Sequence, residues 1–162
     1  MKKINKLSFI LFLMILFSKT TVQAQGLATN KLGSIFPEDI KWTSFPAFPK
    51  SAGLSVLIGD PTKAGLYTVR VKVPAGLKLE PHIHPEDRIY TVISGVFYIG
   101  IGNKFEDSKL KAYPPGSVLV LPGNTPHFHW AKSGDYITQV TAIGPLGISY
   151  LDPKDDPRNK KD

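Results

Sequence analysis

The residues of this chain best suited to bind a metal ion are its four histidines, which lie in two short clusters. His82 and His84 are two positions apart, and the same spacing recurs in His127 and His129. An extended strand places residues i and i+2 on one face, and neutral imidazole is the commonest protein ligand of transition metals. If the two strands face each other across a barrel, we expect the four side chains to form a metal pocket.

The beginning of the chain has the pattern of a secretory signal peptide. Lysines precede an apolar run over residues 7–17, which is shorter than the roughly twenty residues that a membrane span needs. Val22, Gln23 and Ala24 then fit a small-x-small cleavage site. We therefore expect residues 1–24 to be removed and the protein to be exported, to the periplasm or outside the cell, with no membrane segment left. The alternative is an uncleaved anchor.

Net charge and cysteine content exclude several classes of protein. The full chain has a net charge of +7, but four of its 20 basic residues and none of its 13 acidic ones lie in the signal peptide, so the mature chain carries +3. Its lysines are scattered, which gives no support to nucleic-acid binding. The chain has no cysteine, so it has neither a disulfide framework nor a lipoprotein anchor.

The mature chain is expected to consist of one domain with two irregular ends. Residues 25–50 form an N-terminal arm, because their prolines prevent a helix. Residues 51–151 form the domain, and residues 152–162 are charged and broken by proline, which predicts a disordered tail. Aromatic side chains of the arm need an apolar surface, either on the same domain or on a second subunit of a homodimer: Trp42, Phe45 and Phe48.

The domain is predicted to be all-β. Short apolar alternations separated by glycine and proline indicate strands, and no stretch has the 3.6-residue period of a helix. Strands are predicted at 54–58, 67–73, 89–93, 96–101, 118–121, 126–131, 136–143 and 148–151, and Ser94-Gly95 predicts a hairpin. Such a pattern is typical of a sandwich or barrel without helices longer than about three turns. The residues predicted to be mostly buried are Val69, Val71, Ile93, Val96, Val118 and Val120.

Two motifs within this pattern resemble those of the cupin superfamily. The first motif comprises Gly76, His82, His84 and Gly95, and the second comprises Gly116, Pro122 and His127. The resemblance covers most of the mature chain, from residue 54 to residue 150. It implies a single-domain jelly-roll β-barrel, often dimeric. It also implies a divalent metal at the mouth, held by both histidines of the first motif, a glutamate, and the histidine of the second.

The chain departs from the cupin pattern at the glutamate. Arg88 stands at that position, seven residues before Gly95. Asn124 replaces a glycine of the second motif, which is a mild change because asparagine tolerates the left-handed conformation. The usual site of three histidines and one carboxylate is therefore not expected to be complete.

Three arrangements of the metal site remain open. In the first, His82, His84 and His127 alone hold the metal. In the second, Glu86 replaces the missing carboxylate, and in the third His129 is a fourth ligand. An imidazole-rich site favours a divalent transition metal such as zinc, iron, copper, nickel or manganese. The alternative to all three is a chain without a functional metal.

Arg88 has two interpretations. It forms a salt bridge with Glu86 or Asp87, or it faces the barrel mouth and binds an anionic group of a substrate, for which a guanidinium is well suited. Tyr90 is a second candidate for substrate binding, with core packing as the alternative. We therefore expect a small-molecule ligand, with an anionic one favoured by Arg88.

The motifs leave two functional classes. The first is a metal-dependent enzyme, dioxygenase-like or isomerase-like, acting on a small molecule. The second is a non-catalytic cupin that binds or senses a metal or ligand. The number of protein ligands separates them, because three ligands leave room for substrate whereas a closed shell of four favours a structural site.

Overall fold

The computed structural model describes residues 26–28 and 30–160. The predicted signal peptide, residues 1–24, lies outside the described residues. Ten strands make up the domain, and all their pairings are antiparallel. They are β1 (Gly53–Ile58), β2 (Gly65–Val73), β3 (Lys78–Ile83), β4 (Arg88–Ser94), β5 (Phe97–Ile101), β6 (Lys111–Tyr113), β7 (Val118–Leu121), β8 (His127–Trp130), β9 (Tyr136–Gly144) and β10 (Ser149–Tyr150).

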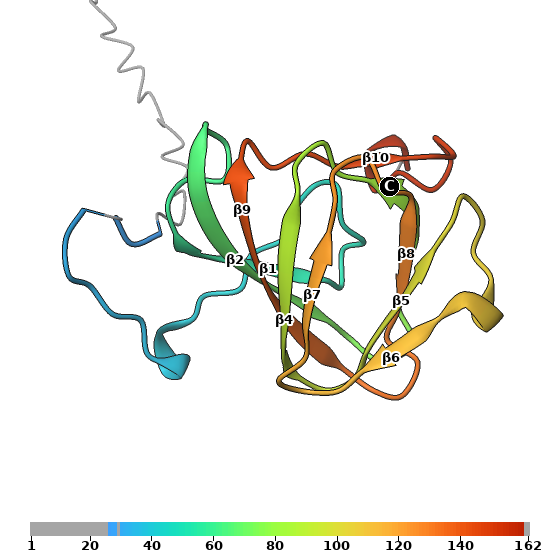
Figure 1. Cartoon of the computed structure of the whole chain (residues 1–162), viewed down its shortest axis with the longest axis horizontal. Helices are drawn as coiled ribbons and strands as arrows, with labels where there is room; N and C mark the ends of the chain where they lie inside the picture. The colour runs from blue at the N-terminus through green and yellow to red at the C-terminus, as the bar shows by residue number, and fades with distance from the viewer. Residues whose placement is uncertain (1–25, 29, 161–162) are drawn as a thin grey trace, which may run out of the picture.

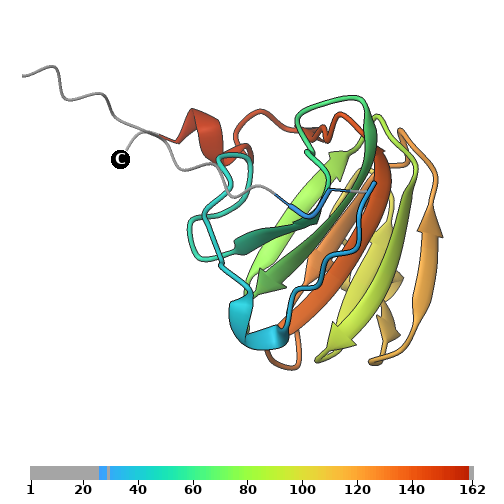
Figure 2. The ribbon, with the colours of Figure 1, turned by 90° about the vertical axis from the view of Figure 1, so that its left-hand side faces the viewer.

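The strands form two five-stranded sheets that pack face to face. One sheet has the order β1-β2-β9-β4-β7 and the other has the order β10-β3-β8-β5-β6. Figure 1 shows the first sheet beside the second, and the view turned by 90° shows the two layers (Figure 2). Helical structure in the described residues is limited to the 3-10 segments η1 (Pro37–Asp39), η2 (Asp107–Lys109) and η3 (Pro157–Asn159). The all-β prediction is confirmed.

The two histidine clusters lie on neighbouring strands. β3 pairs with β8, and His82 is directly opposite His127 in the register of this pair. The metal pocket was expected on the condition that the two strands face each other across the barrel, whereas they are adjacent in one sheet. Adjacency brings the histidines closer than opposite walls would, since paired residues in antiparallel strands lie only about 5 Å apart.

The core prediction is right for β2 and wrong for β4 and β7. Val69 and Val71 are buried, whereas Ile93, Val118 and Val120 are 37%, 63% and 71% exposed. The reason is the orientation of β4, which points Arg88 and Tyr90 inward and thereby turns alternate residues outward. β7 follows this register through its pairing with β4, so its valines also lie on the outer face. Val96 is half-buried in the turn after β4.

Ser94 and Gly95 form a tight turn, but not the predicted hairpin. β4 pairs with β7 and β9, and β5 pairs with β6 and β8, so this turn carries the chain from one sheet to the other. Gly95 has a φ of +68°, and a Cβ atom there would lie 2.0 Å from the carbonyl oxygen of Asp135. Asn124 adopts the expected left-handed conformation, with a φ of 58°.

The two irregular ends both contact the domain. In the arm, Thr43 bridges to Leu54 of β1 and Phe48 is buried against the chain's own barrel; the arm lies at the β1–β2 side, away from β6 (Figure 1). The predicted homodimer stays a prediction. The predicted disorder of 152–162 is wrong for residues 152–160. They form turns and η3, because Arg158 donates hydrogen bonds to Asp156 and to the carbonyl of Ile148. No helix in the described ranges is long and apolar enough to span a membrane.

Candidate metal centre

All four histidines converge in the interior of the barrel. Their side chains are 0–5% exposed. The ring centroids of His82 and His127 are 4.2 Å apart, and the other close pairs, 82–84, 82–129, 84–127 and 127–129, lie at 5.0 to 5.2 Å. Four imidazoles this close together can share one ion or ligand.

Three of the histidines are oriented by backbone carbonyl groups. The Nδ1 atom of His82 lies 2.7 Å from the carbonyl oxygen of Glu80, that of His84 lies 2.6 Å from the oxygen of Gly147, and that of His127 lies 2.8 Å from the oxygen of Thr125. A carbonyl oxygen only accepts, so each Nδ1 carries the proton and donates. Each Nε2 atom therefore carries a lone pair, which is the form in which histidine binds a metal.

Burial keeps the four rings neutral. It lowers the pKa of His82, His84 and His129 well below the usual value, and neighbouring charges add to the effect. Burial also lowers the pKa of His127, to about 4. At neutral pH the rings consequently offer lone pairs rather than positive charges.

Two criteria select different sets of three histidines. His82, His127 and His129 each offer a ligand atom, and these atoms lie within 4.8 Å of one another, so this group could hold a metal ion. The backbone anchors, by which we mean the hydrogen bonds from Nδ1 to backbone carbonyl oxygens, instead select His82, His84 and His127. We give more weight to the anchors, because a ring that donates to a carbonyl is held in one orientation, whereas a small rotation changes the distance between two nitrogens. His82 and His127 belong to both sets.

Arg88 forms the predicted ion pair with Glu86. Their side chains are 4% and 7% exposed, and the guanidinium donates from Nη2 and, over 2.9 Å, from Nε to one carboxylate oxygen of Glu86. The same oxygen accepts a bond of 2.7 Å from the Tyr67 hydroxyl. A buried ion pair is stable only when such additional hydrogen bonds satisfy its remaining atoms. Glu86 is thus committed to Arg88 and is not brought into the histidine group.

The peptide group of Gly147 joins this ion pair to the histidines. Its N–H donates to Glu86, and its carbonyl oxygen accepts from both Arg88 and His84. The site requires glycine here, because a Cβ atom would lie 2.6 Å from Cγ of Pro85. One peptide group therefore positions a candidate metal ligand and the ion pair of Arg88 with Glu86.

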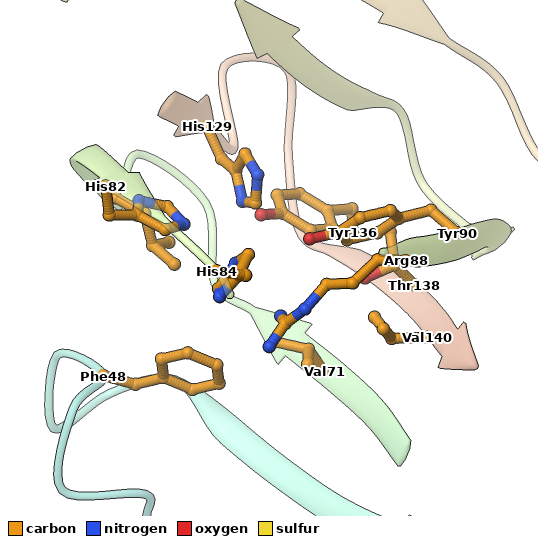
Figure 3. Close-up of a pocket in the computed structure, with 11 residues that line it drawn as sticks. Phe48, Val71, His82, His84, Arg88, Tyr90, His129, Tyr136, Thr138 and Val140 are labelled. Carbon is orange, nitrogen blue, oxygen red and sulfur yellow. The ribbon is translucent and has the colours of Figure 1, made fainter. Parts of the chain in front are cut away.

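A small cavity, with about 20 Å³ open to the centre of a water molecule, lies next to the histidines. Figure 3 shows His82, His84 and His129 on one side of it and Arg88 and the rings of Tyr90 and Tyr136 on the other, with both tyrosine hydroxyl groups directed toward the histidines. Its other lining residues are mainly apolar: Phe48, Val71, Leu79, Thr138 and Val140. An apolar cavity with a few converging polar groups is the usual form of a small-molecule site.

Comparisons with known proteins identify this architecture. No family model matches the chain, and neither does any curated protein. Among solved structures, the polyketide cyclase RemF from Streptomyces resistomycificus is 16% identical, with a TM-score of 0.63 over 79% of this chain and 91% of its own. An RmlC-like cupin protein from Ralstonia eutropha JMP134 is 24% identical, with a TM-score of 0.58 over 78% and 76%. The chain has the cupin fold.

A third similar structure is that of an enzyme. The DMSP lyase DddQ from Ruegeria pomeroyi DSS-3 is 21% identical, with a TM-score of 0.56 over 69% of this chain and 61% of its own. Identities this low show the fold alone, and a fold hosts many functions. Proteins of this fold therefore include a cyclase and a lyase, so the fold does not assign a function to this chain.

At the position of the motif glutamate, the site departs from the cupin pattern that the sequence resembles. Arg88 occupies the place of the family's glutamate and cannot coordinate a metal, because a guanidinium stays protonated and has no lone pair to offer. The histidines fit a transition metal without it: their donors are neutral, their rings are anchored, and the Nε2 atoms of His127 and His129 have no hydrogen-bond partner among the described residues.

Three residues of the site were not predicted. Tyr136 and Tyr67 lie on strands whose alternation was recognised, and following that alternation from Val140 or Val69 would have pointed both tyrosines inward. Gly147 gave no signal in the sequence, because its role depends on backbone atoms. Tyr90, a candidate, is buried, stacks on Phe97 and lines the cavity.

Proposed function

We propose that this protein is an exported, metal-dependent cupin enzyme that acts on a small anionic molecule. His82, His84 and His127 would hold a divalent transition metal such as zinc, iron, copper, nickel or manganese. The observation that carries the proposal is the set of three backbone anchors, which aim three neutral imidazoles into one space. Export rests on the signal-peptide pattern of residues 1–24.

The other groups of the cavity would bind and orient the substrate. A bound divalent metal would act as a Lewis acid toward a substrate oxygen. Arg88 lines the cavity, and its bonds to Glu86 and Gly147 use Nε and Nη2, whereas a guanidinium has five N–H donors. It would hold the anionic group, and the apolar walls would exclude water. The reaction is of a dioxygenase or isomerase type.

A non-catalytic role in metal or ligand binding is the alternative. It is favoured by the closeness of His129 to His82 and His127, because a fourth imidazole would close the coordination shell. The two functions differ in the number of protein ligands, so they can be separated by measuring metal binding in variants that each lack one ring.

The experiment is elemental analysis of the full chain purified without a histidine tag. We expect about one transition metal ion per chain, loss of metal in His84→Ala and in the control His127→Ala, and retention in His129→Ala. Loss in both His84→Ala and His129→Ala would indicate four ligands and the non-catalytic role. Equal metal content in parent and His127→Ala would remove the metal site altogether.

A further inference from the structure

Tyr136 and His129 line one end of the cavity, which we name its inner end, and this end contains two polar atoms without partners. The Tyr136 hydroxyl and the Nε2 atom of His129 have no hydrogen-bond partner among the described residues, although their residues are only 1% and 5% exposed. Buried polar atoms are nearly always hydrogen-bonded, because an unpaired one loses its bonds to water without replacement. Both residues line the cavity, so a molecule that enters it can bond to both.

Aromatic neighbours hold the rings of Tyr136 and His129 in place. Tyr136 packs on Phe97 with ring centroids 5.1 Å apart, and His129 lies edge-on to Phe97 at 4.8 Å and to Tyr90 at 6.2 Å. These contacts fix where the two polar atoms point without using them. Figure 3 shows the Tyr136 hydroxyl directed toward the side of the cavity where His129 lies. The arrangement is that of a preorganised pair rather than of two side chains with a free choice of partner.

The two atoms have complementary hydrogen-bonding character toward oxygen. The phenol of Tyr136 donates, so it suits a carbonyl or hydroxyl oxygen. His129 offers its Nε2 either as an acceptor from a hydroxyl group or, in the other tautomer, as a second donor to a carbonyl. At the other end, Arg88 supplies a positive charge, and Tyr90 also lines the cavity. The cavity thus offers one site for an anion and a separate one for a neutral oxygen.

We propose that Tyr136 and His129 form a second binding point, and that the ligand is a small carboxylate with an additional carbonyl or hydroxyl oxygen. The carboxylate lies on Arg88 and the additional oxygen lies between Tyr136 and His129. This deepens the proposed function by naming the class of ligand. His129 is then a ligand-binding residue and not the fourth metal ligand.

The test compares two probes that differ only in that oxygen. Pyruvate and propanoate are titrated by calorimetry into the zinc-loaded full chain. We expect the parent to bind pyruvate about 10-fold more tightly than propanoate, since a site built for a hydrogen bond rejects an analogue that lacks it. Tyr136→Phe is expected to remove this ratio while leaving the propanoate affinity unchanged. An equal affinity of the parent for both probes, or no binding of either at millimolar concentration, would overturn the assigned ligand class.

A stability measurement separates a binding role from a structural one. Because the Tyr136 hydroxyl has no partner, Tyr136→Phe should raise the melting temperature of the ligand-free protein. The matched control is Tyr67→Phe, which removes a hydroxyl bonded to Glu86; it should lower the melting temperature and keep the pyruvate-to-propanoate ratio. A lower melting temperature in Tyr136→Phe would show that the hydroxyl has a structural partner and would overturn the proposal.

Metal content distinguishes this proposal from the proposed function. His129→Phe should keep its metal and lose the ratio; if it loses its metal instead, His129 is a metal ligand and its assignment to the substrate is wrong. Should the parent bind no metal, the proposed function fails. In that case the ratio of the affinities for pyruvate and propanoate is measured on the metal-free parent and on metal-free Tyr136→Phe. The comparison of the two proteins then decides whether Tyr136 binds the additional oxygen.

Discussion

The two ends of the cavity are built in opposite ways. At the outer end, Arg88, Glu86 and His84 bond to one another or to the single peptide group of Gly147, and Tyr67 adds a further bond. At the inner end, the polar atoms of Tyr136 and His129 have no partner among the described residues. The outer end is therefore held by internal bonds and offers a ligand only the remaining N–H donors of Arg88, whereas both polar atoms of the inner end keep their hydrogen-bonding capacity for a ligand. Burial alone does not reveal this difference, because both ends are almost inaccessible to water.

The largest expected effect comes from breaking the outer end. Arg88→Met leaves the Glu86 carboxylate buried without its cation, and we expect the free energy of unfolding to fall by about 3–5 kcal/mol. The measurement is denaturant unfolding at pH 7.

The control for Arg88→Met is Lys109→Met, which removes the cation of the exposed pair with Glu106 and should cost less than about 1 kcal/mol. Similar losses in the two variants would mean that the outer end is not held together by its ion pair.

The next effect is on the pH dependence of the metal-free protein. Burial lowers the pKa of His127 to about 4 from 6.5, so between these values the unfolded chain binds a proton that the folded chain does not. Stability is therefore fully present above pH 6.5 and falls as the pH is lowered to 4, by about 3 kcal/mol for His127 alone. Denaturant unfolding with a chelator present, at a series of pH values, measures the loss.

The histidine at the inner end should contribute to the same slope. Burial also lowers the pKa of His129, so His129→Phe is expected to make stability less dependent on pH in this range. An unchanged slope would show that His129 has a partner in the folded protein, and the contrast between the two ends would be lost.

The smallest effect concerns the bond between Gly147 and His84. In Gly147→Ala the new Cβ atom would collide with Pro85, which moves the carbonyl oxygen away from Nδ1 of His84. We expect the affinity for zinc to fall about 10-fold, as is typical when a group that orients a metal ligand is lost. Competition with a fluorescent chelator measures it, and the exposed Ser149→Ala is the control. An unchanged affinity would mean that this anchor does not orient a metal ligand.

Much of the fold could be predicted, but the assignment of faces could not. Short alternating segments predicted most strands, including β2 and β9. The stretch Arg88–Ser94 carries apolar residues on both faces, with Tyr90 and Val92 on one and Ile89 and Ile93 on the other. An alternation with a period of two shows which residues share a face of the strand, but not which of the two faces is buried. In the structure Arg88 lies on the buried face with Tyr90 and Val92, and its bonds to Glu86 and Gly147 offset the cost of burying its charge.

The parts of the site that could be predicted are those formed by side chains close together in the sequence. The histidine spacing and the ion pair of Arg88 with Glu86, two residues apart, could be inferred. The bonds of Gly147 could not, because they join residues about sixty positions apart through backbone atoms that any residue has. Tyr136 was missed for a different reason: an inward tyrosine is usually a core residue, and only its unpartnered hydroxyl distinguishes it.

The use of one peptide group by three side chains has a consequence for ligand access. Gly147 lines a second pocket together with Phe45, Leu146 and Ile148, and its carbonyl oxygen bonds to His84, so the segment around it forms a wall between that pocket and His84. If this wall moves, the bonds to His84, Arg88 and Glu86 break together rather than one at a time. Access through it and the orientation of His84 are then thermodynamically linked, with one coupling free energy acting in both directions. A metal ion that favours the oriented His84 would hold this wall closed, and a ligand that opens the wall would loosen the metal by the same factor.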